Sequence, residues 1–175
     1  MDSDLRKYIR NVPDFPKKGI VFRDITTLLK NPIALKEAIE QLYESTKGLK
    51  IDKVVGIESR GFIFGAMLAE RLNAGFVLLR KPGKLPAETE KELYDLEYGR
   101  DSIEIHKDAI SPGDKVLIHD DLLATGGTAK AAIKLVEKLG GEVVQVLFLI
   151  ELSFLKGREK LKGYNVKSLI DYTGE

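Results

Sequence analysis

The chain has 175 residues, of which 43 % are hydrophobic and 31 % charged, with a formal net charge of +1. This balance is typical of a globular protein and gives no support for nucleic acid or a membrane surface as a partner. The chain has no cysteine, which excludes disulfides, thiolate metal sites and a cysteine nucleophile. The length suits one domain, which we expect to cover residues 1–175. The sequence has neither an 18-residue apolar run nor a signal-peptide core, so we expect a cytoplasmic location.

The N-terminal segment combines a polar start with a stretch rich in proline. Residues 1–10 predict a short polar helix. Residues 12–25, V-P-D-F-P-K-K-G-I-V-F-R-D-I, contain two prolines and a glycine that should prevent regular structure before Ile20. Ile20 to Phe22 then predicts a short edge strand. On local features, residues 1–30 form either an arm that packs on the core or a hood over a ligand.

A strand, a polar loop and a helix follow. Asn31 and Pro32 supply the N-cap and first-turn proline of one helix. Residues 51–57 then predict a buried strand and residues 62–72 a second helix. Arg60, in the loop between them, would place a planar donor fork at a helix start, which suits a pyrophosphate or carboxylate oxygen. A surface arginine in an ordinary ion pair is the alternative.

The next strand leads into a basic turn. Residues 75–79 predict the strand, and the turn R-K-P-G-K-L-P places Arg80, Lys81 and Lys84 within five residues. Such a run is often only a solvated surface. Its place at the carboxyl end of a strand, where α/β sheets bind ligands, favours phosphate binding instead.

Residues 87–100 are highly charged and fit no clean period, so they predict a long surface hairpin or loop. Long loops of this kind are often lids over a site. Residues 102–106 alternate as a strand that returns antiparallel to the first arm.

The central stretch is residues 116–128, V-L-I-H-D-D-L-L-A-T-G-G-T. Its aliphatic start predicts a strand buried on both faces, and Asp120 and Asp121 should follow the strand's end. His119 should be a partly buried, hydrogen-bonded side chain and not a metal ligand. Residues 143–150 and 166–170 predict two further strands.

The loop at residues 124–128 should bind an anion, because its backbone N–H groups and the positive end of the following helix point to one place. Asp120 and Asp121 would repel a phosphate and therefore need a neighbouring group rich in hydroxyls. A ribose 5-phosphate offers both features. The stretch has no P-loop lysine, and no G-x-G-x-x-G follows a strand.

Residues 116–128 resemble the phosphoribosyl-pyrophosphate (PRPP) signature of type I phosphoribosyltransferases, in the form found in adenine phosphoribosyltransferases. The segments F-P-x-x-G-I-V-F-R-D-I, E-S-R-G-F, R-K-x-G-K-L-P and L-E-Y-G are similar to further motifs of that family, so the resemblance runs from Phe15 to Ile170. It implies an α/β fold with a central, mostly parallel sheet flanked by helices, an N-terminal base-binding hood (residues 1–30) and a flexible catalytic loop (residues 87–100).

The resemblance also implies a reaction: a phosphoribosyl group passes from PRPP to adenine, giving AMP and pyrophosphate in purine salvage. It assigns base binding to the Val21 backbone, to Phe22 by stacking and to Leu122 on the opposite face of the purine. Catalytic roles fall on Arg60 and on Glu97, as a proton acceptor or relay. PRPP binding falls on Asp120, Asp121, Ala124, Thr125, Gly126, Gly127 and Thr128, and pyrophosphate binding on Ser59, Arg60, Arg80, Lys81 and Lys84.

The resemblance further implies Mg²⁺ held mainly through PRPP, with no direct protein ligand, and a homodimer. Two alternatives remain at this stage. An enzyme for hypoxanthine, guanine, xanthine or orotate would share the PRPP half, so only Val21 and Phe22 argue for adenine. A non-catalytic, PRPP-sensing regulator would need a nucleic-acid-binding module or a basic face, which neither chain length nor net charge supports.

Overall fold

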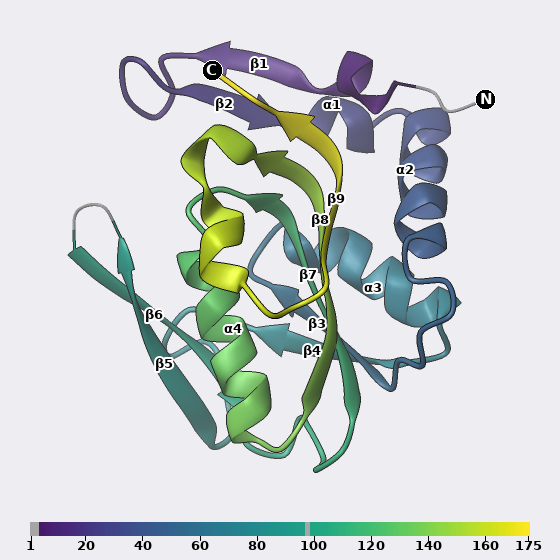
Figure 1. Ribbon diagram of the computed structural model, residues 1–175, viewed down its shortest axis with the longest axis vertical. Coiled ribbons are helices and arrows are strands. Elements are labelled where there is room, and N and C mark those ends of the chain that lie inside the picture. The colour runs from purple at the N-terminus through teal and green to yellow at the C-terminus, as the bar shows by residue number, and fades with distance from the viewer. Residues whose placement is uncertain (1–3, 97–98) are drawn as a thin grey trace.

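The computed structural model describes residues 4–96 and 99–175, and its centre is a five-stranded parallel sheet (Figure 1). The predicted α/β fold with a mostly parallel central sheet is confirmed. All four neighbouring strand pairs are parallel. The strands, in sheet order, are β4 (Gly75–Leu79), β3 (Lys53–Ile57), β7 (Lys115–Leu123), β8 (Glu142–Leu152) and β9 (Val166–Tyr172).

Helices cover both faces of this sheet (Figure 1). On one face, α2 (Pro32–Glu44) and α3 (Gly61–Arg71) pack with Leu117 into one apolar cluster. On the other face, α4 (Gly127–Lys138) packs with Val116 and Ile118 into a second cluster. Because successive side chains of a strand point to opposite faces, the aliphatic run in β7 supplies both clusters.

The hood is a two-stranded antiparallel ladder of β1 (Arg10–Pro13) and β2 (Val21–Asp24), flanked by a short 3-10 helix, η1 (Leu5–Tyr8), and by α1 (Thr26–Leu29). Two local expectations are wrong here. The helix expected over residues 1–10 is a single 3-10 turn within the described residues, and regular structure resumes at Arg10 instead of Ile20. Pro13 is tolerated because β1 is an edge strand of a two-stranded ladder, where a missing N–H can face away from the partner strand.

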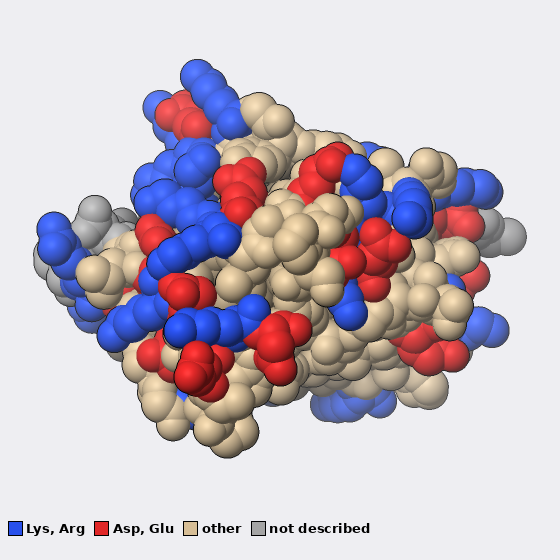
Figure 2. Space-filling view, turned by 90° about the horizontal axis from the view of Figure 1, so that it is seen from below, with Lys and Arg blue, Asp and Glu red and all other residues tan. Residues whose placement is uncertain are grey.

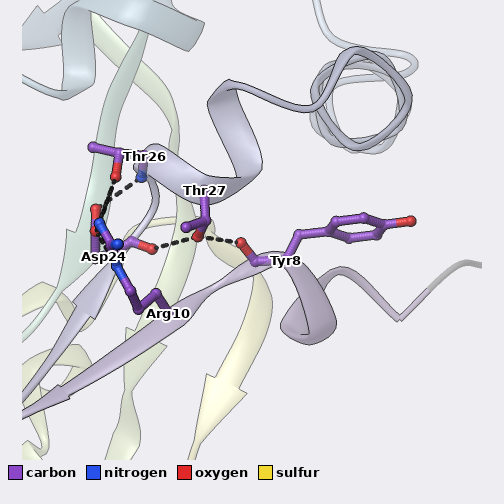
Figure 3. A network of polar contacts seen from close by, with 5 residues as sticks. All are labelled: Tyr8, Arg10, Asp24, Thr26 and Thr27. Carbon is purple, nitrogen blue, oxygen red and sulfur yellow. Dashed lines mark hydrogen bonds and ion pairs between the residues drawn. The ribbon is translucent and has the colours of Figure 1, made fainter.

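A polar network around Asp24 fixes the hood strands to α1 (Figure 3). Its carboxylate accepts hydrogen bonds from the Thr26 backbone N–H and hydroxyl, both at 2.8 Å, and from Arg10 Nε at 2.9 Å. The Thr27 hydroxyl donates to the Tyr8 carbonyl at 2.6 Å. The hydrogen bonds that the Asp24 carboxylate accepts, of which the one from the Thr26 backbone has the largest effect, lower the pKa of Asp24 to about 2.

The charged stretch after β4 forms a hairpin of β5 (Thr89–Leu96) and β6 (Gly99–His106), so the hairpin alternative holds and the loop alternative does not. The inner face of β6 joins the core beside α4. Ion pairs also link β5 to α4: Glu92 to Lys134 at 2.8 Å and Glu90 to Lys138 at 2.5 Å. Acidic and basic side chains interleave over the face of the molecule that is seen from below in Figure 1 (Figure 2).

Two short 3-10 helices, η2 (Ser153–Leu155) and η3 (Gly157–Leu161), connect β8 to β9. Within residues 4–96 and 99–175, no helix combines the length and the apolarity that a membrane span requires.

Candidate functional site

The two adjacent carboxylates lie inside β7, not after it. The strand was expected to end before Asp120, but its parallel pairing with β8 continues to Leu123. The neighbouring strand supplies backbone partners that the sequence of β7 alone cannot reveal. Asp121 is buried, at 4 % exposure, and Asp120 is partly exposed as a whole residue although its carboxyl group is buried.

The loop at residues 124–128, where the sequence predicts an anion site, lies at the carboxyl end of β7. It encloses a cavity of about 80 Å³. Gly126 adopts φ +78°, and a Cβ there would lie 2.4 Å from the Gly157 carbonyl oxygen, so only glycine fits. The N-terminus of α4 begins in the same loop and directs its positive dipole end there. The cavity is lined by Asp120, Leu122, Leu123, Ala124, Thr125, Gly126, Gly127, Thr128, Ala129 and Phe148.

Arg60 is the cation beside the acid pair. Its Nε lies 2.7 Å from Asp121 Oδ2, and the Asp121 backbone N–H donates to Asp120 Oδ1 at 2.9 Å. Burial raises the pKa of both carboxyls, the neighbouring negative charge raises that of Asp120 further, and Arg60 opposes the rise at Asp121. The pair is therefore short of hydrogen-bond donors, which the hydroxyl groups of a ligand supply.

The loop at residues 58–61, between β3 and α3, packs directly on β7. A Cβ on Gly61 would lie 2.8 Å from the His119 carbonyl oxygen and 3.0 Å from Asp120 Oδ1, so glycine permits this approach. Ser59 follows Glu58 in the same loop, after a cis peptide bond. The guanidinium of Arg60 lies 5.0 Å from the centre of the Phe22 ring, which brings loop, hood and acid pair together.

Glu58 accepts hydrogen bonds from the basic turn that follows β4. Its carboxylate lies 3.2 Å from Arg80 and 3.0 Å from Lys84, and it accepts the Lys81 backbone N–H at 2.7 Å. Burial would raise the pKa of Glu58, but these donors prevail and lower it to about 2. Glu58 was not predicted as a site residue. The available signal was topological: β3 and β4 are parallel neighbours, so residues after each strand meet at one sheet edge.

The ammonium of Lys81 contacts the hairpin instead. It pairs with Asp101 on β6 and lies 3.0 Å from the Tyr94 hydroxyl on β5. Neither hairpin residue was anticipated, because their proximity depends on a strand register that has no local sequence signal. Each of the four predicted cations therefore contacts a carboxylate. They are Arg60, in the loop after β3, and Arg80, Lys81 and Lys84, in the turn after β4.

The two predicted base-binding residues of the hood lie next to each other on β2. The Phe22 ring meets the Phe15 ring edge-on, with ring centres 5.3 Å apart. The Val21 N–H donates to the Glu175 side chain at 2.8 Å and not to β1, so this backbone edge is directed away from the ladder. Leu122 lines the anion cavity. Glu175 was not anticipated, since it is far from Val21 in sequence.

His119 departs from expectation. It is fully buried, so the expected partial burial is wrong. The Leu147 backbone lies beside the ring, but neither ring nitrogen makes a well-formed hydrogen bond to the described residues. The ring packs edge-on against Phe64 in the apolar core. Burial lowers its pKa to about 4, so the ring is neutral near pH 7. The described residues hold no cluster of three or more metal-ligating side chains, and Glu97 lies outside them.

Comparisons with known proteins agree with this geometry. The model of the phosphoribosyl transferase domain matches residues 24–173. An adenine phosphoribosyltransferase of Christiangramia forsetii is 62 % identical over 170 residues, which cover 97 % of this chain and 99 % of the relative.

Solved structures give the same result. The crystal structure of adenine phosphoribosyltransferase from Thermoanaerobacter pseudethanolicus has a TM-score of 0.96 at 56 % identity, covering 98 % of this chain and 100 % of the other. The Saccharomyces cerevisiae enzyme, in complex with an imino-altritol bisphosphate and adenine, has a TM-score of 0.89 at 44 % identity, covering 95 % and 97 %. The chain therefore belongs to the phosphoribosyltransferase family, among the adenine phosphoribosyltransferases.

Proposed function

We propose that this protein transfers the 5-phosphoribosyl group of PRPP to adenine, giving AMP and pyrophosphate. The observation that carries the proposal is the meeting of three parts around Arg60: an anion cavity, a buried acid pair and an aromatic hood. Each part suits one portion of the substrates. The similarity to adenine phosphoribosyltransferases supports adenine as the base.

The PRPP end of the site divides into a phosphate part and a ribose part. The 5-phosphate enters the cavity at residues 124–128, where loop N–H groups and the hydroxyls of Thr125 and Thr128 donate to it. Asp120 and Asp121 accept hydrogen bonds from the ribose hydroxyls. These donors offset the cost of charge in the buried pair, so the acids favour a polyol ligand over a bare anion.

The pyrophosphate leaves toward the cations of residues 59–60 and 80–84. Negative charge grows on it as its bond to the ribose breaks, and positive charge grows on the sugar. Arg60, Lys81 and Lys84 stabilise the leaving group, with Arg80 and Ser59 as further contacts, because charge-assisted bonds strengthen as the charge develops. No covalent nucleophile is required.

The base stacks on Phe22 and is covered on its other face by Leu122. The Val21 edge pairs with the adenine amino group and a ring acceptor, which a single C=O and N–H can match. Adenine N9 attacks while a proton leaves N7. The resemblance assigns that proton to Glu97, and Glu97→Gln should lower kcat much more than PRPP affinity if the assignment is right.

The site also fits Mg²⁺ as a companion of PRPP. Asp120 and Asp121 are hard oxygen donors next to the ribose position, able to accept hydrogen bonds from metal-bound water. The cation, held mainly by PRPP oxygens, supplies charge neutralisation for the pyrophosphate.

The deciding experiment gives the purified protein PRPP and Mg²⁺ with adenine, hypoxanthine, guanine, xanthine or orotate in separate reactions. Nucleotide and pyrophosphate are then quantified. AMP from adenine alone supports the proposal in full. A different nucleotide would retain the PRPP site and reject the base assignment, and PRPP binding with no product would favour a regulator.

Three further expectations belong to the same proposal: one domain over the whole chain, a homodimer and a cytoplasmic location. Light scattering coupled to size-exclusion chromatography tests the dimer. Cell fractionation tests the location, and limited proteolysis tests the single domain.

A further inference from the structure

Lys81 is held by the hairpin through a defined set of contacts. Its ammonium pairs with Asp101 and lies 3.0 Å from the Tyr94 hydroxyl, which itself donates to Asp101 at 3.1 Å. The second carboxylate oxygen of Asp101 accepts the Ser102 backbone N–H at 2.7 Å. Both carboxylate oxygens of Asp101 therefore accept hydrogen bonds, and the side chains of Lys81, Tyr94 and Asp101 all contact one another.

The hairpin register explains why these groups meet. Tyr94 and Asp101 are direct cross-strand partners of β5 and β6. Asp101 shares the face of β6 that Ile103 and Ile105 present to the core, so its carboxylate is directed toward the body of the molecule. A main-chain bridge pairs Arg80 with Glu104, at 2.8 and 3.0 Å, and anchors the base of the hairpin beside Lys81.

This ion pair is partly shielded from water, with 41 % of the Lys81 side chain and 31 % of the Asp101 side chain exposed. The same ammonium is assigned to pyrophosphate in the proposed function, on which this inference rests. One ammonium has three donor positions, and Asp101 and Tyr94 already engage part of them. A pyrophosphate that draws the ammonium toward its own oxygens competes with the Asp101 carboxylate for the same cation.

We propose that Asp101 and Tyr94 are positioning residues for Lys81, which hold its ammonium before pyrophosphate or PRPP binds and release it to the phosphate oxygens on binding. The Arg80–Glu104 bridge stays in place during the exchange, so only the contacts of the Lys81 ammonium with Asp101 and Tyr94 are broken.

The test compares equilibrium binding of pyrophosphate with Mg²⁺ by calorimetry in the wild type and Asp101→Asn, together with steady-state kinetics for PRPP. Asp101→Asn should bind pyrophosphate about threefold to fivefold more tightly, since it removes the competing half of a partly exposed ion pair. The KM for PRPP should fall in the same ratio without a rise in kcat, and the gain should shrink as salt is added.

Glu92→Gln is the matched control. It also removes one negative charge and one ion pair from the hairpin, but its partner is Lys134 on α4. It should leave pyrophosphate affinity unchanged. In a Lys81→Met background, Asp101→Asn should have no effect, because the cation for which both anions compete is gone. Asp101→Glu should restore the wild-type affinity.

An equal gain in Glu92→Gln, a gain that persists in Lys81→Met, or an unchanged or weaker affinity in Asp101→Asn would overturn the inference. If thermal melts show that Asp101→Asn does not fold, Tyr94→Phe decides, with a smaller gain in the same direction expected. The two proposals fail separately. A wild type that makes no AMP refutes the proposed function, whereas normal AMP formation with unchanged Asp101→Asn binding refutes this inference alone.

Discussion

Arg60 bridges Phe22 and Asp121. Its guanidinium lies 5.0 Å from the centre of the Phe22 ring, and its Nε lies 2.7 Å from Asp121 Oδ2. These partners come from the hood and from the central strand of the sheet, far apart in sequence. In the proposed reaction Phe22 stacks on the base and Asp121 holds the ribose, so Arg60 lies where both substrates meet.

Arg60→Ala should lower kcat/KM for PRPP by about 10²–10³, because it removes a charge-assisted donor from the leaving pyrophosphate. Steady-state kinetics with PRPP as the varied substrate measures the loss. Arg71→Ala is the matched control, since Arg71 lies at the other end of the same helix in an ion pair with Glu40. Similar losses in both variants would reject a specific role for Arg60.

Asp120→Asn should move activity and stability in opposite directions. It should raise the KM for PRPP and lower turnover, since the ribose loses a charged acceptor. It should also raise the free energy of unfolding, by about 0.5–2 kcal/mol, since a buried like-charge pair is relieved. The sign follows from the pKa of Asp120, which is raised in the folded state, so its ionised form destabilises the fold above the unfolded-state pKa.

Urea unfolding near pH 7 tests the stability half of this prediction. Asp52→Asn is the control with the opposite sign. Asp52 accepts the Lys115 N–H at 2.9 Å, which lowers its pKa, so removing its charge should destabilise the protein. An Asp120→Asn variant that keeps full activity would remove the ribose assignment.

Local patterns predicted the scaffold well, for a physical reason. The inner strands of the central sheet, β3, β7 and β8, are runs of aliphatic residues buried on both faces, and runs of that kind need no partner to be recognised. The loop at residues 124–128 was placed between a strand and a helix for a similar reason: a strand, glycines and a helix start follow one another directly in the chain. Even so, the acid pair was misplaced, because the pairing partner in β8 decides where β7 ends.

Contacts that depend on register or on distant segments could not be predicted. The Lys81–Asp101 pair requires the hairpin register, and the bond from Val21 to Glu175 joins two ends of the chain. His119 looked like a polar residue with a partner, but its surroundings come from other elements and are apolar.

Asp24→Asn should weaken the attachment of the hood, by about 1–2 kcal/mol near pH 7, because the variant keeps the shape but loses charge-assisted acceptors. The folded-state pKa is lowered to about 2. The carboxylate therefore stabilises the fold fully above the unfolded-state pKa of about 4, and this stabilisation is lost as the pH falls toward 2.

Urea unfolding of wild type and Asp24→Asn across this pH range gives the measurement. The difference between the two free energies of unfolding should be largest near neutral pH and should close as the carboxyl becomes protonated. A difference that stays constant with pH would mean that side-chain geometry, and not charge, holds the hood.

Gly126→Ala should disable the anion loop through two separable effects. Alanine at φ +78° incurs the cost of the left-handed region, about 1–2 kcal/mol, and its Cβ would lie 2.4 Å from the Gly157 carbonyl oxygen. Gly163→Ala isolates the first effect, because Gly163 has φ +93° and a Cβ there would meet nothing within 4 Å.

Both variants should lose thermal stability, and Gly126→Ala should lose more. Only Gly126→Ala should raise the KM for PRPP, by about tenfold to a hundredfold, because the displaced loop no longer aligns the phosphate. Equal KM values in the two variants would mean that the loop tolerates displacement from Gly157, and that the 5-phosphate is held elsewhere.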